Sequence, residues 1–160
     1  MTVDGTDFQI YEPTPFSKKW YSHKFAGAGL RYEVAVCIQT GDIVWFNGPF
    51  PCGSWPDLKI FRSGLKEKLL HGEMVEADRG YRGEPTKVRT PNDYVSQTDK
   101  KAKKRARARH ETINRRLKQF GCLRQMFRHG VEKHKAVFAA VAVCTQLCFE
   151  NGERPFQCAY

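Results

Sequence analysis

The spacing of apolar residues changes along the chain, and this change constrains the fold more than any other feature. Early segments are short and rich in β-branched and aromatic residues, as strands are. Later segments are longer, with apolar residues at helical spacing. We predict strands over residues 4–10, 30–38, 43–46, 74–77 and 87–90, and helices over residues 54–71, 100–120 and 131–149.

The order of these elements predicts the class of fold. The first three strands follow one another closely and are expected to form an antiparallel meander. The fourth comes after a helix, so it returns to the sheet by a crossover and lies parallel to one of the first three. We therefore expect an α/β protein with a mixed five-stranded sheet flanked by helices, and 160 residues are enough for one such domain with a core.

Details of the helices follow from the same pattern. Ser54 is expected to cap the first helix, with Pro56 and Asp57 in its first turn. The last helix is apolar nearly all round, which predicts a core position and buried thiols at Cys144 and Cys148. In the helix over residues 100–120, the residues expected to face the core are Ala106, Ile113, Leu117 and Phe120.

Charge is distributed unevenly. Residues 1–78 hold 8 Lys and Arg against 10 Asp and Glu, whereas residues 79–160 hold 19 against 7, so the second half carries the whole excess of the +10 net charge. A basic surface of this kind favours an anionic partner, with double-stranded DNA the first candidate.

The six cysteines show no paired zinc-ligand spacing. The sequence shows no signal peptide and no apolar run of membrane-spanning length, so we expect an intracellular protein with reduced thiols.

Three acids stand where a metal site would be built. Asp4 lies in the first strand, Asp78 closes the fourth, and Glu111 lies on the basic helix, on the face opposite Ile113. If the two strands are parallel neighbours, Asp4 and Asp78 lie roughly 5 Å apart and repel each other unless a cation is present. Carboxylate oxygens suit Mg²⁺ or Mn²⁺, and a two-ion site activates a water or a 3′-hydroxyl at a phosphodiester.

Each acid also has a simpler interpretation. Asp4 and Asp78 suit turns at strand ends, with Asp7 and Glu76 as nearby competitors. Glu111 has ordinary ion-pair partners at helical spacing. Asp57 is either an accessory ligand or a favourable charge at a helix amino terminus.

Other side chains near these acids have two possible roles. His110 is a candidate for proton transfer, although the helix directs it away from Glu111. The aromatic segment around Trp20, Tyr21 and His23 suits either edge packing or DNA contact. The basic helix is either a solvated or nuclear-localisation surface or a contact for the DNA backbone. The residues expected to hold DNA phosphates are Lys103, Lys104, Arg107, Arg115 and Lys118.

The chain resembles the catalytic domain of Harbinger-like DDE transposases over nearly its whole length. Each matching segment is weak alone, and their order and spacing together make the resemblance specific. The segments are Val3-Asp4-Gly5-Thr6, Gly53-Ser54-Trp55-Pro56-Asp57-Leu58 with Ile60-Phe61-Arg62, Ala77-Asp78-Arg79-Gly80-Tyr81, Thr90-Pro91, and Ala108-Arg109-His110-Glu111 with Asn114, Leu117, Lys118 and Phe120.

The resemblance implies an RNase H-like fold and a metal-binding catalytic triad of Asp4, Asp78 and Glu111, holding two Mg²⁺ or Mn²⁺ ions. It implies hydrolytic cleavage at transposon ends and strand transfer of a DNA 3′-hydroxyl, in the nucleus, or in the cytoplasm if the source is a prokaryote. On this view residues 1–160 are a single catalytic domain without the amino-terminal DNA-binding region of such transposases. A separate DNA-binding protein and self-association are then expected partners.

Two alternatives remain. The first is a domesticated, catalytically inactive DNA-binding protein that keeps the fold and the basic surface. The second is a ribonuclease H-type enzyme, which shares the fold but not the sequence around these motifs.

Overall fold

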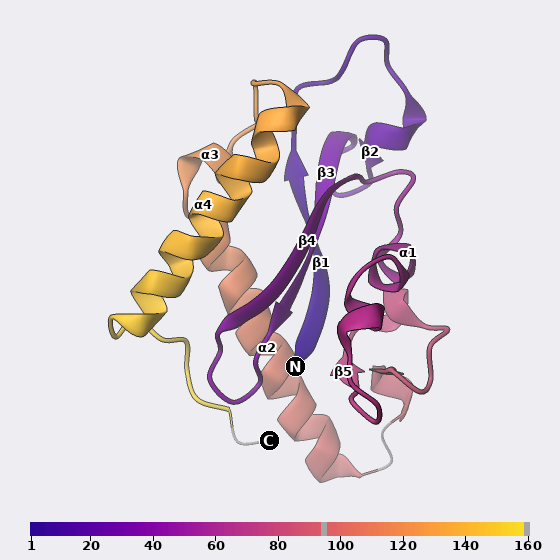
Figure 1. Ribbon diagram of the computed structural model, residues 1–160, viewed down its shortest axis with the longest axis vertical. Helices are drawn as coiled ribbons and strands as arrows, with labels where there is room; N and C mark the ends of the chain where they lie inside the picture. Colours follow the sequence, from indigo (N-terminus) through magenta and orange to yellow (C-terminus); the bar gives the residue numbers. More distant parts are fainter. Residues whose placement is uncertain (94–95, 159–160) are drawn as a thin grey trace.

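The computed structural model describes residues 1–93 and 96–158. Its elements follow the predicted order (Figure 1). The strands are β1 (Thr2–Gln9), β2 (Tyr21–Ser22), β3 (Gly27–Val36), β4 (Ile43–Pro51), β5 (Val75–Glu76) and β6 (Val88–Arg89). The helices are α1 (Asp57–Arg62), α2 (Gln97–Leu117), α3 (Gly121–Arg124) and α4 (Val131–Glu150), and short 3-10 turns cover Lys18–Trp20, Leu65–Lys68, Arg79–Tyr81 and Pro91–Asp93.

The strands form one mixed sheet, which has six strands within the described residues. The order is β2-β3-β1-β5-β6, with β4 paired to β3. β1, β3 and β4 form the predicted antiparallel meander, while β5 lies parallel to β1 and β6 parallel to β5. The prediction of an α/β fold with a mixed sheet is confirmed. The additional strand, β2, is a two-residue pairing with β3 inside the aromatic segment.

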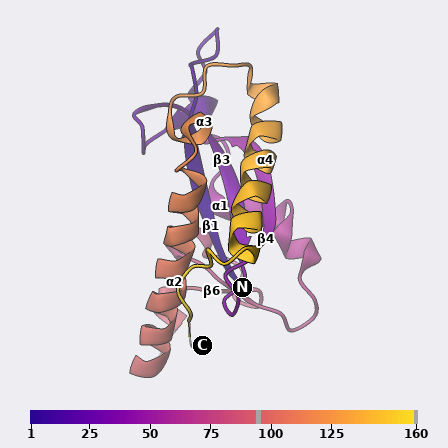
Figure 2. The same ribbon diagram turned by 90° about the vertical axis from the view of Figure 1, so that its left-hand side faces the viewer.

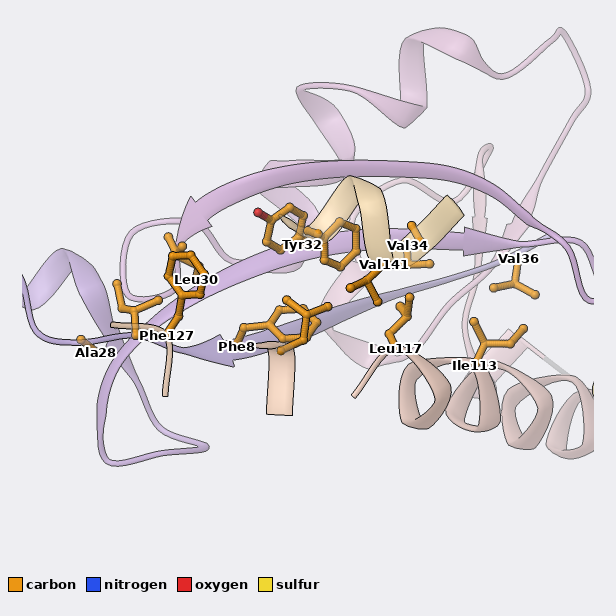
Figure 3. Close-up of a cluster of buried hydrophobic side chains, with 14 of the residues drawn as sticks. Phe8, Ala28, Leu30, Tyr32, Val34, Val36, Ile113, Leu117, Phe127 and Val141 are labelled. Carbon is orange, nitrogen blue, oxygen red and sulfur yellow. The ribbon is translucent and has the colours of Figure 1, made fainter. Parts of the chain in front are cut away.

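Helices cover both faces of the sheet. Figure 2 shows α2 and α4 running lengthwise over one face, while α1 lies on the other side of the strands in Figure 1. Alternation along β3 supplies both layers, since Tyr32 and Val34 face α2 and α4 whereas Ala35 faces α1. The first layer is the larger, and Figure 3 shows side chains of the strands meeting Ile113, Leu117 and Val141.

The predicted helix over residues 54–71 is broken into α1 and a 3-10 turn. The break falls at Gly64, where a Cβ atom would overlap the Asn47 amide and crowd the Trp45 ring. Side chains of β4 therefore pack closely against the backbone at this glycine, and α1 ends at Arg62, just before this contact. Ser54 does not cap α1, because the N-cap position is occupied by Pro56.

The last helix is not buried all round, and the prediction of buried thiols is wrong. α4 buries one face, which includes His134, Phe138 and Phe149, whereas Cys144 and Cys148 lie on the exposed face. A nearly uniform apolar sequence does not indicate which face meets the sheet. Phe120 is 37% exposed, since α2 ends at Leu117 before reaching it. The predicted core positions Ala106, Ile113 and Leu117 are buried.

No helix in the described ranges is long and apolar enough to span a membrane.

Candidate metal-dependent nuclease site

The register of two parallel strands brings Asp4 and Asp78 to the same level of the sheet. Thr2 of β1 pairs with Glu76 of β5, so the residues two positions further along each chain lie next to each other. Asp78 comes directly after the strand and caps the turn Arg79–Tyr81, where its Oδ1 accepts a hydrogen bond from Gly80 N at 2.7 Å. The predicted parallel arrangement of the two acid-bearing segments is confirmed.

Helix α2 brings the third acid to the same place. Asn114 Nδ2 donates to Asp4 Oδ2 at 3.2 Å, which ties the helix to the end of β1. Glu111 lies three residues before Asn114, on the adjacent turn of the same helix face. Asp4, Asp78 and Glu111 therefore line one hollow of about 180 Å³, together with Lys24 and Arg107 and with residues of both strands.

The electrostatics of this hollow are most visible at Asp4, which is held close to other acids. The pKa of Asp4 is raised to about 6, first by burial and then by the charges of Asp78 and Glu111, with Lys24 acting in the opposite direction. One Asp4 oxygen accepts a hydrogen bond from Gly5 N at 2.8 Å. The hydrogen-bond donors to Asp4 are neutral, and Lys24 offsets only part of the effect of burial and of the two neighbouring acids, so a cation between the carboxylates would be favourable.

The donor set fits a hard divalent cation. The acids offer only oxygen ligands, and burial together with the charges of Asp78 and Glu111 raises the pKa of Asp4, a cost that a bound cation would offset. Within the described residues, however, no three His, Cys, Asp or Glu side chains lie close enough to hold one ion together. Asp4, Asp78 and Glu111 would hold the ions, and small side-chain movements must accompany their binding.

The competing acid Asp7 belongs to a different environment. It is fully buried on the opposite face of β1 and accepts hydrogen bonds from Arg31 Nε at 2.7 Å and from Ser22 Oγ at 2.8 Å. Burial alone would raise the pKa of Asp7, but the Arg31 bonds hold it below its usual value. Asp7 is a structural ion-pair partner.

Asp57 lies between this ion pair and the hollow. It is 3.2 Å from Arg31 Nη1, and its carboxylate occupies the space in which Gly5 and Gly80 would carry a Cβ atom. Burial raises the pKa of Asp57, and the charge of Asp78 adds to this effect. A favourable charge in the first turn of a helix therefore does not fully explain Asp57. Its carboxylate packs against the backbone at Gly5, next to Asp4, and at Gly80, two residues after Asp78.

The predicted phosphate contacts do not share one environment. Lys104, Arg107 and Arg115 are exposed. Lys118 is half-buried, with Nζ 5.3 Å from the centre of the Phe8 ring, and burial together with Lys24 lowers its pKa.

Lys103 does not fit its predicted role. It is 8% exposed and its Nζ lies 2.9 Å from both carboxylate oxygens of Glu76. Its charge is therefore used inside the fold, because α2 turns this position toward β5. Glu76, a competitor of Asp78, is held in the same pair.

His110 lines the hollow but is structural in its contacts. It is buried, its Nδ1 lies 2.8 Å from Thr2 Oγ1, and burial lowers its pKa to about 3. A histidine with this pKa is neutral at physiological pH and joins α2 to β1.

Sequence reasoning missed two basic residues. Arg109 is 1% exposed and donates to the backbone oxygens of Ile38, Gln39 and Phe156. Its place four residues before the core residue Ile113 was a usable signal. Lys24, which lines the hollow and donates to Gly5 O at 3.4 Å, had no such signal, because it arrives from a distant loop.

The mixed sheet with helices on both faces is that of an RNase H-like α/β protein. A family model described as DDE superfamily endonuclease matches residues 3–148. The chain belongs to this family. No curated protein and no solved structure matches the chain.

Proposed function

We propose that this chain is a divalent-metal-dependent DNA endonuclease and transposase domain of the Harbinger-like type. The observation that carries the proposal is the meeting of Asp4, Asp78 and Glu111 at one hollow in a chain of the DDE endonuclease family. The proposed substrate is double-stranded DNA, cleaved at a phosphodiester and then joined through a 3′-hydroxyl. A separate DNA-binding protein and a second copy of the chain are proposed partners.

The roles of the side chains follow from their positions. Asp4, Asp78 and Glu111 would hold two Mg²⁺ or Mn²⁺ ions, and the chemistry that such ions would supply is charge stabilisation at the phosphate and activation of the attacking oxygen. Asn114 orients Asp4 through its amide hydrogen bond. Lys24 and Arg107 lie at the same hollow, where they offset phosphate charge.

The test is nicking of supercoiled plasmid by the purified chain with Mg²⁺ or Mn²⁺. We expect nicking that is lost in Asp4→Asn, Asp78→Asn and Glu111→Gln and kept in Asp99→Asn, which removes an exposed acid in the first turn of α2. Asp78→Asn should leave DNA affinity nearly intact at moderate salt. Equal nicking by the parent chain and the three variants would refute the triad.

The alternative is a domesticated DNA-binding protein. It is favoured by one observation, the absence within the described residues of three ligands already close enough for one ion. Plasmid that is shifted on a gel but never nicked, with no Mn²⁺ binding detected by calorimetry, would decide for it.

A further inference from the structure

A second hollow of about 460 Å³ adjoins the carboxylates and has no assigned role. It lies between the first half of α2 and the segments that follow β5 and β6. Glu76, Ala77, Arg107 and Glu111 line both hollows, so the two adjoin along these residues. A ligand bound in the larger hollow therefore lies next to Glu111, one of the three predicted catalytic acids.

The lining of this second hollow combines small apolar residues with cations. Ala77, Pro91 and Ala108 contribute the apolar part. Lys100, Lys104 and Arg107 are exposed side chains at its edge.

The cations form a stripe that leads to the acids. Lys100, Lys104, Arg107 and Glu111 follow one another at spacings of four, three and four residues, which places them along one face of α2. At 1.5 Å per residue the stripe is roughly 16 Å long. Glu76 adds little negative charge to the hollow, because Lys103 pairs with it at 2.9 Å.

We propose that this hollow binds one unpaired nucleotide of the DNA strand, next to the bond cut at the carboxylates. The base lies against Ala77 and Ala108, and the flanking phosphates lie on Lys100, Lys104 and Arg107. This inference rests on the proposed function, since it assumes that DNA is the ligand at Asp4, Asp78 and Glu111.

The size and chemistry of the hollow favour a nucleotide over a simple anion. A phosphate ion is much smaller than 460 Å³ and gains nothing from the apolar residues. A nucleotide uses both kinds of lining at once. The base must be unpaired, because a base inside a duplex is stacked and cannot enter a pocket.

The test measures binding without cleavage. A fluorescent thymidine oligonucleotide of about 12 residues and its abasic counterpart are titrated by anisotropy in EDTA. We expect the parent chain to bind the base-containing strand about fivefold more tightly, as burial of roughly 40 Å² of apolar surface predicts. Equal affinity for the two strands would overturn the proposal.

Two variants with matched controls locate the effect. Ala108→Leu places a larger side chain in the hollow and should abolish the base-dependent difference, whereas Ala140→Leu, at an exposed alanine of α4, should keep it. A difference that survives Ala108→Leu contradicts the assignment. Circular dichroism of both variants is the check that they are folded.

The second pair of variants tests the cations, and the variant and its control have the same net charge. Lys100→Ala with Lys104→Ala should flatten the salt dependence of binding by about 1.4 log units per log unit of salt, for two lost contacts with a single strand. Lys101→Ala with Arg105→Ala changes two exposed cations outside the hollow and should have less than half this effect. Equal effects would overturn the cationic stripe.

Failure of this inference is distinguishable from failure of the proposed function. If the parent chain binds the base, loses this binding in Ala108→Leu and does not nick plasmid, the nucleotide pocket is supported and the proposed nuclease activity is refuted. If the chain nicks plasmid but shows no base-dependent binding, the nuclease activity is supported and the nucleotide pocket is refuted.

Discussion

Asp4 and Asp7 lie three residues apart on the same strand, yet their pKa values are shifted in opposite directions. An odd spacing directs them to opposite faces of β1. Asp7 meets Arg31 and Ser22, and its pKa is lowered although it is buried. Asp4 is half-buried and meets Asp78 and Glu111, and its pKa is raised to about 6.

The difference teaches how to separate structural acids from functional ones. A buried acid that is fully compensated by a cation and hydrogen bonds stabilises the fold and has no free charge to offer a ligand. An acid held among other acids costs stability, and the rest of the fold must offset that cost. A site of this kind is a candidate for function because the missing partner is a cation.

The largest expected effect is on stability, at Asp7. Asp7→Asn removes one member of a buried ion pair and leaves the Arg31 guanidinium without its main partner. We expect the free energy of unfolding to fall by about 3 kcal/mol, measured by urea denaturation. DNA nicking per folded molecule should remain, and loss of nicking in fully folded Asp7→Asn would break the distinction between the two acids.

Asp4→Asn should show the opposite pattern, a loss of nicking without a loss of stability. It removes a proposed metal ligand and relieves repulsion, so nicking should fall by at least about 100-fold, beyond the typical cost of losing a residue that only supports a metal ligand. The midpoint of thermal unfolding should stay the same or rise. A destabilised Asp4→Asn with parental nicking would reverse the comparison.

Glu33 extends the comparison to an acid that is buried without a cation beside it. Burial raises its pKa to about 8, and Trp45 Nε1 donates to it at 3.3 Å. The unfolded chain loses this proton near pH 4.5 and the folded chain near pH 8, so this residue makes the fold less stable as pH rises between those values.

Through Glu33, the free energy of unfolding of the parent chain should fall by about 2 kcal/mol between pH 5 and pH 7. We expect Glu33→Gln to lack this fall. Urea denaturation of the parent and the variant at the two pH values measures the difference. Parallel pH profiles would show that Glu33 is ionised in the folded protein.

The smallest expected effects compare two neighbouring lysines. Lys104 is exposed, so Lys104→Ala should reduce the salt slope of duplex binding by about 0.9, the value for one phosphate contact. Lys103 is paired with Glu76, so Lys103→Ala should leave that slope unchanged and lower the unfolding temperature instead. Salt titrations of DNA affinity, alongside thermal melts, measure both. A lower salt slope in Lys103→Ala would show that the ion pair opens to DNA.

Local sequence patterns predicted much of the fold. Strands and helices were recognisable from residue type and spacing. The intervening helix predicted that the fourth strand lies parallel to one of the first three, and the structure pairs it with β1. The errors came where local information is ambiguous. Gly64 ends a helical pattern because β4 passes beside it. In α4, where apolar residues occur nearly all round the helix, Cys144 and Cys148 are exposed because the sheet meets the other face.

The order of the elements, the basic second half and the three acids of the candidate site can all be recognised in the amino-acid sequence. Which charges are compensated becomes clear only in the folded chain. Lys103 and Lys104 are adjacent cations, yet one is buried against Glu76 and the other lies at the edge of the hollow. Lys24 reaches the same hollow from a loop far away in the sequence. The physical reason is that the free energy of a charge depends on its neighbours in space, which short-range sequence spacing does not specify.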